Sequence, residues 1–195
     1  MPTMPPVTRA LLLINVAVFF LQSLIAPGIT AAFELWPIGP NFLPWQVVTY
    51  AFLHGSFEHL FFNMLGLWMF GSELERVWGD KRFLQFYTAS VLAAAATQLV
   101  VNALMATPYP TIGASGGLFG LLLAFAMMFP NRTILLFFVI PMKAKYLVAL
   151  YGLLELYQGF YVMNSGVAHF AHLGGMVGGL LMIRYWRGQP PFGRR

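Results

Sequence analysis

The sequence predicts an all-α membrane protein in which six transmembrane helices form one bundle. Hydrophobic residues make up 59% of the 195 residues and charged residues only 9%, whereas soluble domains carry about 25% charged residues. The chain contains apolar runs close to the length of about 20 residues that crosses a bilayer. Its basic residues gather beside alternate ends of these runs. We therefore expect a single transmembrane domain over residues 1–195, with both termini in the cytoplasm.

The composition also limits the partners and the chemistry. The net charge of +5 comes from Lys and Arg residues scattered among apolar runs, and these form no continuous basic stripe for nucleic acid. We therefore expect a lipid bilayer around the chain and no nucleic-acid partner. Because the chain has no cysteine, it can form no disulfide, thiolate nucleophile or cysteine-based metal site.

Proline marks the ends of several expected helices. Pro27 ends the first, Pro130 ends the fourth, and Pro141 precedes the fifth. The first run follows Arg9 as a signal peptide would, but its length of about 17 residues is enough to span a bilayer. Because further spans follow, we expect a retained helix. The six expected spans cover about 9–27, 57–74, 83–106, 115–130, 145–163 and 168–187.

The distribution of charge supports six spans. With a cytoplasmic N-terminus, all 11 Lys and Arg residues fall near the cytoplasmic ends of the spans, which is the positive-inside pattern. A five-span or seven-span arrangement would break this pattern. The segments expected outside contain no Lys or Arg, and they are 28–56, 107–114 and 164–167.

Two connecting segments have a character of their own. Residues 28–56 carry Trp36 and Trp45, and since aromatic side chains favour the headgroup region, we expect this loop to lie partly in the outer interface. Residues 131–144 are apolar before Pro141, and we expect a re-entrant or interfacial segment there. The chain shows no internal repeat, which argues against a transporter built from inverted repeats.

A serine is expected below the outer surface of the membrane. About 15 residues separate Gly116 from Pro130, which makes roughly 22 Å of helix against about 30 Å of hydrocarbon. A fourth helix anchored at the cytoplasmic face therefore stops short of the outer surface, with Ser115 at its sunken N-terminus. The loop before Ser115 must dip inward, which requires protein or water around it.

Three further polar residues are expected at the same depth. His172 lies about one turn into the sixth span, and His59 and Asn63 share one face of the second because they are four residues apart. Polar side chains inside a membrane are costly and usually mark functional sites. The four residues, from three helices, therefore predict one site near the outer face.

This set of residues predicts serine hydrolysis. A serine hydroxyl needs an adjacent base, and histidine is the usual one, so we expect His172 to serve Ser115. The N–H groups at the start of the fourth helix can receive an oxyanion, and His59 and Asn63 can add donors. We find no acid placed to orient His172 and expect a Ser-His dyad. Glu155, in the fifth span, receives no firm role.

Glycines are expected to let the helices approach closely. Gly113 and Gly116 flank the motif of Ser115, while Gly175 and Gly179 form a G-x-x-x-G pattern in the sixth span. Close packing of the fourth and sixth helices would bring the serine within hydrogen-bond reach of its expected base.

Three motifs together resemble those of the rhomboid intramembrane serine proteases. They are His59-x-x-x-Asn63, Gly113-Ala-Ser115-Gly116 and His172-x-x-Gly175-x-x-x-Gly179, and the likeness runs from about residue 9 to residue 187. The resemblance implies a six-helix bundle with a water-filled cavity open to the outside. It implies Ser115 as nucleophile, His172 as base, and His59, Asn63 and the Ser115 amide as oxyanion donors. It also implies transmembrane protein substrates and neither a metal nor another cofactor.

Two positions differ from the pattern common in that family. Phe119 stands where many members have a tyrosine packed on the imidazole, so the ring can stack but offers no hydroxyl. Gln46 follows Trp45 where many members have arginine, which leaves the anchoring of the first loop open.

Other interpretations stay open beside the catalytic one. Ser115 could be a helix-packing serine, and His59 and Asn63 could be polar contacts between helices. The alternative function is a catalytically inactive relative that binds transmembrane clients, and a small transporter is a third class. A metalloprotease would need H-E-x-x-H, whereas here Glu58 precedes the histidine.

The remaining expectations concern supporting parts. We expect His169 at the cavity rim, His54 in a structural or interfacial position, and residues 73–76 as a structural end of the second helix. We expect the fifth helix with the loop 163–167 to gate substrate entry. The minimal length favours a bacterial inner membrane.

Overall fold

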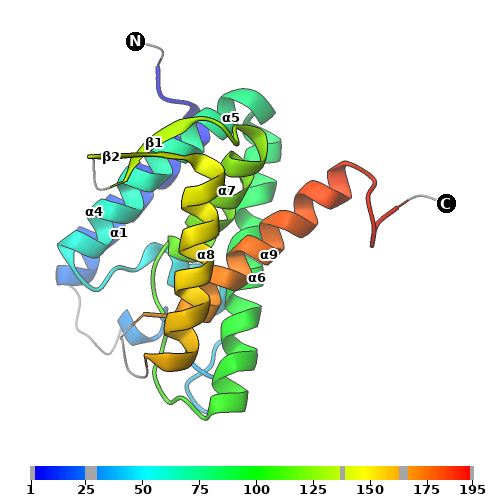
Figure 1. Cartoon of the computed structure of the whole chain (residues 1–195). Coiled ribbons are helices and arrows are strands. Elements are labelled where there is room, and N and C mark those ends of the chain that lie inside the picture. The colour runs from blue at the N-terminus through cyan, green and yellow to red at the C-terminus, as the bar shows by residue number, and fades with distance from the viewer. Residues whose placement is uncertain (1–2, 25–29, 137–138, 163–166, 194–195) are drawn as a thin grey trace.

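The computed structural model describes residues 3–24, 30–136, 139–162 and 167–193. Its helices form a bundle in which α6 runs along the length of the molecule and α9 crosses it at an angle (Figure 1). The elements are α1 (Pro6–Leu24), α3 (Gln46–Thr49), η1 (Tyr50–Phe52), α4 (Phe57–Gly66), η2 (Leu67–Gly71), α5 (Ser72–Trp78), α6 (Asp80–Met105), α7 (Ser115–Met128), β1 (Thr133–Leu136), β2 (Ile140–Lys143), α8 (Ala144–Tyr161) and α9 (His169–Trp186).

The six expected helices are confirmed as helices, with ends within a few residues of the prediction. The second is one continuous helical segment from Phe57 to Trp78, because α4, η2 and α5 follow one another without a break. Among the described helices, α6 is the one whose length and composition alone suffice for a membrane crossing, while the apolar α1 and α7 are shorter. The expected shortness of the fourth helix is confirmed, since α7 has 14 residues.

The centre of the bundle depends on glycine contacts between α7 and α9. A Cβ atom at Gly175 would overlap the carbonyl oxygen of Gly116, and one at Gly179 would lie 3.3 Å from the Cα of Gly120. Such backbone contact is possible only without side chains. The expected close packing of the fourth and sixth helices is therefore confirmed.

The first loop is anchored by the side chain of Gln46, which is fully buried. Its Oε1 accepts from the backbone N–H of Leu43 at 3.1 Å and of Trp36 at 3.3 Å. Its Nε2 donates to the carbonyls of Asn41 at 3.1 Å and Ala32 at 3.3 Å. The amide thus satisfies four backbone groups, and glutamine serves as the anchor of this loop.

The segment 131–144 differs from the all-α expectation. It contains an antiparallel β-hairpin in which β1 pairs with β2 and Thr133 lies opposite Lys143. The hairpin lies across one end of the bundle, beside the start of α8 (Figure 1). The bundle itself is helical as predicted, and the hairpin is a local addition in which Ile and Thr of β1 favour a strand.

The buried carboxylate of Glu75 joins α5 to the N-terminus of α1. Its Oε1 accepts from Val7 N at 2.8 Å, and its Oε2 accepts from Thr8 N at 2.7 Å and Thr8 Oγ1 at 2.6 Å. Free N–H groups at a helix N-terminus favour a negative charge. The expected structural role of this stretch is confirmed for Glu75.

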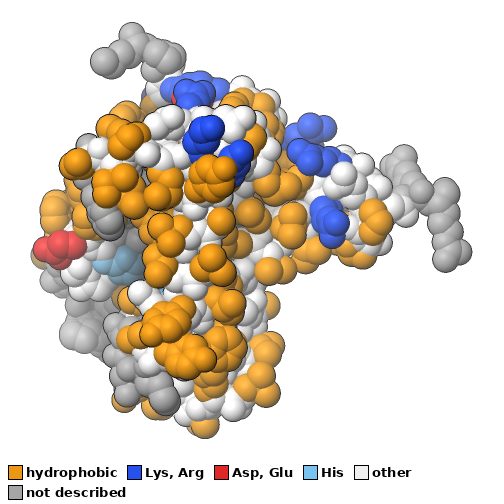
Figure 2. Space-filling model, viewed as in Figure 1, with side chains coloured by type: hydrophobic (Ala, Val, Ile, Leu, Met, Phe, Trp, Pro, Cys, Tyr) orange, Lys and Arg blue, Asp and Glu red, His pale blue; other side chains and the backbone are white. Residues whose placement is uncertain are grey.

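Basic side chains gather toward one end of the molecule. Figure 2 shows Lys and Arg at the end that carries the hairpin and on the last part of α9, while the opposite end is mostly apolar on this face. This arrangement has the sidedness that the positive-inside pattern predicts.

Candidate active site

Ser115 is the first residue of α7, and the loop before it is enclosed by protein. The backbone N–H of Gly113 donates to the carbonyl of Tyr50 at 2.9 Å, and the hydroxyl of Tyr50 donates to the carbonyl of Val91 at 2.9 Å. Gly113 has φ +122°, a conformation that favours glycine. Ala114 is buried. The residues directly before Ser115 are therefore surrounded by protein, as an inward dip of this loop requires.

The side chain of His172, from α9, contacts the serine. Its Nε2 lies 2.7 Å from Ser115 Oγ, within hydrogen-bond distance. The imidazole stacks on Phe119 with the ring centroids 4.2 Å apart and the planes inclined by 3°. Tyr151, from α8, packs its ring edge-on to the same phenylalanine. The expected stacking at position 119 is confirmed, and the histidine is held in one plane.

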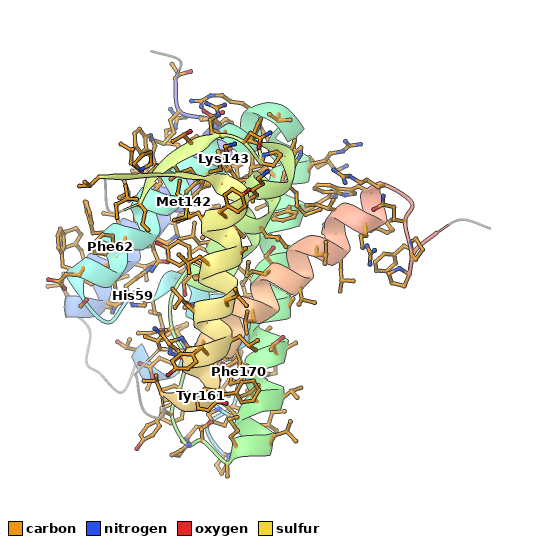
Figure 3. The ribbon with its side chains drawn as sticks, in the orientation of Figure 1. His59, Phe62, Met142, Lys143, Tyr161 and Phe170 are labelled. Atoms are coloured by element: carbon orange, nitrogen blue, oxygen red, sulfur yellow. The ribbon has the colours of Figure 1, made fainter. Side chains whose placement is uncertain are left out.

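His59 and Asn63 approach the same place from α4. Ser56 caps this helix, and its Oγ accepts from the backbone N–H of His59 at 3.1 Å. A Cβ atom at Gly113 would lie 2.7 Å from His59 Nε2 and 3.6 Å from Ser115 Oγ, so both side chains flank one glycine. The Asn63 Nδ2 donates to the carbonyl of His59 at 2.8 Å. In Figure 3, His59 lies at the end of α4 that is distant from Lys143.

A cavity of about 510 Å³ is lined by Ser115, His59 and Asn63. Its walls come from α4, η2, α7, β1 and α8, and most of its lining side chains are apolar. Its polar lining residues are Glu58, His59, Asn63, Ser115 and Tyr151. An apolar cavity with a few convergent polar groups is typical of a binding or active site.

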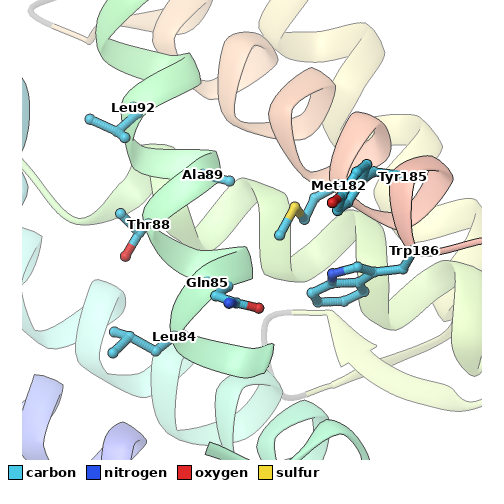
Figure 4. A pocket seen from close by; sticks show the side chains of 8 residues that line it. All are labelled: Leu84, Gln85, Thr88, Ala89, Leu92, Met182, Tyr185 and Trp186. Carbon is cyan, nitrogen blue, oxygen red and sulfur yellow. The ribbon is translucent and has the colours of Figure 1, made fainter. Parts of the chain in front are cut away.

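A second hollow, of about 420 Å³, lies between α6 and α9 (Figure 4). Its lining contains no histidine, serine or carboxylate, so the candidate chemistry belongs to the first cavity. The lining residues are Leu84, Gln85, Thr88, Ala89, Leu92, Met182, Tyr185 and Trp186.

Glu155, on α8, contacts both histidines of α9. Its Oε2 lies 2.6 Å from His169 Nδ1 and 3.0 Å from His172 Nδ1. The expectation that no acid stands beside His172 is therefore wrong. His169 is buried rather than placed at the cavity rim. The sequence offered one signal for this contact, since Glu155 is an acid in an expected membrane span and His169 and His172 follow in the next span. The sequence did not show that α8 and α9 face each other at these residues.

His54 is fully buried against His59, with the ring centroids 4.9 Å apart. Its backbone N–H donates to Gln22 Oε1 at 3.2 Å, and its carbonyl accepts from Gln22 Nε2 at 2.7 Å. Burial, with a smaller effect of His59, lowers the pKa of His54 to about 4. These contacts agree with the expected structural position of His54.

The helical bundle brings the Ser115 hydroxyl within hydrogen-bond distance of the His172 imidazole, and the serine lines a cavity. The chain belongs to the rhomboid family, because the family model described as the Rhomboid domain matches residues 42–188. Members of this family are integral membrane proteins.

Several named relatives align with most of this chain. It is 34% identical over 184 residues to "Rhomboid protein 1, mitochondrial" of Saccharomyces cerevisiae, which covers 88% of this chain and 51% of that protein. It is 34% identical over 136 residues to "Rhomboid protease GluP" of Bacillus subtilis, and the alignment covers 69% of this chain and 24% of that protein. It is 28% identical over 183 residues to "Rhomboid protease GlpG" of Klebsiella pneumoniae, and the alignment covers 91% of this chain and 62% of that protein. The chain thus spans between 24% and 62% of these relatives' lengths.

Proposed function

We propose that this protein is an intramembrane serine endopeptidase that hydrolyses peptide bonds in or near transmembrane segments of other membrane proteins. The observation that carries the proposal is the 2.7 Å contact between His172 Nε2 and Ser115 Oγ, beside a cavity that is lined by this serine. Two of the relatives are named rhomboid proteases, which supports the same activity. Ser115 and His172 form the catalytic pair in this proposal.

In the proposed reaction, Ser115 Oγ attacks the carbonyl carbon of the scissile bond while His172 Nε2 takes the hydroxyl proton. The tetrahedral oxyanion accepts hydrogen bonds from the Ser115 amide and from the His59 and Asn63 side chains. His172 then gives its proton to the leaving amine. Water hydrolyses the resulting acyl-enzyme and restores the serine, so no metal or cofactor takes part.

The substrate in this proposal is a transmembrane helix that unwinds locally, because a peptide carbonyl inside an intact helix is shielded from attack. The cavity wall between α4 and α8 is apolar apart from its catalytic end, which suits a lipid-soluble segment. The proposed gate is α8 with the loop that follows it, of which residues 163–166 lie outside the described residues.

The proposed topology has six spans, with both termini in the cytoplasm and the catalytic cavity open to the other side. The sidedness of the basic side chains supports it. A bacterial inner membrane is the proposed location, and the named relatives come from bacteria and from a mitochondrion.

Cleavage by the purified protein in liposomes tests the proposal. We expect a single-span model protein to be cut near its outer end by the wild type and left intact by a folded Ser115→Ala variant. Release of products at equal rates by both proteins would refute the assignment of Ser115. Stable binding of the single-span protein without cleavage by the wild type would instead favour the inactive, client-binding alternative.

A further inference from the structure

The fifth helix carries a carboxylate that reaches the far side of the catalytic imidazole. Glu155 Oε2 lies 3.0 Å from His172 Nδ1, while Ser115 Oγ lies 2.7 Å from Nε2 of the same ring. Serine, imidazole and carboxylate therefore stand in a row that draws on α7, α9 and α8. The carboxylate and both imidazoles are largely enclosed, with side-chain exposures of 12% for Glu155, 5% for His169 and 10% for His172.

The order of these atoms decides which ring nitrogen must carry the proton. His172 can take the serine proton only if Nε2 is unprotonated, so the neutral ring must be protonated at Nδ1. An ionised carboxylate is purely an acceptor, and one beside Nδ1 favours this tautomer. It also stabilises the imidazolium that forms when Nε2 gains a proton.

His169 fixes the position of this carboxylate. Its Nδ1 lies 2.6 Å from the same oxygen, Oε2, and it precedes His172 by three residues on α9, so both rings approach α8 from one helix face. An unpaired carboxylate would be costly in this enclosed place. The contact with His169 compensates that cost and keeps Oε2 beside the second ring.

We propose that Glu155 is a positioning residue that holds His172 in the Nδ1-protonated form with Nε2 directed at Ser115. This inference rests on the proposed function, since it describes how the proposed base is oriented. Glu155 Oε2 lies near His172 Nδ1, but the two atoms are not aligned as in a good hydrogen bond. Hydrogen bonds in active sites are often poorly aligned before substrate binds and tighten in the transition state.

Substrate kinetics in liposomes test the role. For Glu155→Gln, which keeps the shape and loses the charge, we expect kcat to fall by about 10- to 100-fold with KM within about twofold, because the negative charge that stabilises the imidazolium at Nδ1 is lost. Glu155→Asp should keep a kcat several-fold above that of Glu155→Gln, because charge matters more than fit. Glu73→Gln, which changes a partly exposed glutamate on α5 outside the cavity lining, is the matched control and should leave kcat unchanged.

The outcomes separate this inference from the proposed function. Equal kcat values for the wild type and a folded Glu155→Gln variant, with Ser115→Ala inactive, would overturn the role of Glu155 alone. Loss of activity on treatment with a chelator would also overturn it, since the carboxylate would then serve as a metal ligand. In wild-type protein labelled with ¹⁵N-histidine, we expect the His172 signal, assigned with His172→Ala, to show protonation at Nδ1. A proton on Nε2 would contradict the inference even if the variants failed to fold.

Discussion

The contact between α7 and α9 makes Gly175→Ala the most informative packing variant. The added Cβ would overlap the Gly116 carbonyl oxygen and lie 2.8 Å from the carbonyl carbon. Because these are backbone atoms, no side-chain rotation can relieve the overlap. The two helices must separate until the contact reaches about 3.5 Å, an outward movement of roughly 1–2 Å.

Two effects of that movement follow. Overpacking of this kind costs about 1–3 kcal/mol in the free energy of unfolding. A shift of about 1 Å between the helices would also lengthen the 2.7 Å contact of His172 Nε2 with Ser115 Oγ beyond hydrogen-bond range. We expect kcat to fall by about 100-fold, the usual effect of such a misplacement.

The assay compares cleavage rates in liposomes and thermal unfolding in detergent for Gly175→Ala and a matched control. Gly152→Ala also adds one methyl group to a helix, but the nearest neighbouring atom to the added Cβ is the Cε of the flexible Met176, at 3.7 Å. The control should keep its activity and gain up to about 1 kcal/mol from helix propensity. Wild-type activity and stability in Gly175→Ala would refute the claim that this glycine sets the distance between serine and histidine.

Three further predictions test other parts of the structure. Glu75→Gln should lower the free energy of unfolding by about 2–4 kcal/mol, because three donors lose a charged acceptor. By contrast, Glu73→Gln on the same helix, which removes only a partly exposed ion pair, should cost less than about 1 kcal/mol. The folded-state pKa of His54, about 4, lies below the ordinary 6.5, so the unfolded state binds more protons between these values. The contribution of neutral His54 to the free energy of unfolding should be fully present above about pH 6.5 and should fall by up to about 3 kcal/mol toward pH 4. When the free energy of unfolding is measured over this pH range, the His54→Gln variant should lack this decrease. Phe119→Leu removes the ring that stacks on the His172 imidazole and should reduce kcat about 3- to 10-fold. An unchanged kcat in this variant would show that the stacking does not contribute to activity.

The helices and the contact between Ser115 and His172 were predictable because they depend on local sequence. Apolar run length and proline positions place the six helices, and the motif glycines predict that α7 and α9 approach closely. The short length of α7 follows from the number of residues between Gly116 and Pro130.

The parts that the sequence did not predict depend on contacts between distant segments. Glu155 is an isolated acid in its helix, and its contact with His172 is visible only where α8 faces α9. Gln46 departs from the family pattern, yet its buried amide satisfies backbone groups of a loop whose path periodicity does not describe. The hairpin after α7 consists of two strands of four residues each, too short to show an alternating pattern.

The nucleophile can be identified directly by labelling with a fluorophosphonate and mapping the adduct by mass spectrometry. Because His172 Nε2 lies 2.7 Å from Ser115 Oγ, the adduct should form on Ser115 in the wild type and disappear in folded His172→Ala. An adduct on another residue, or labelling of Ser115 at an equal rate without the histidine, would contradict the account.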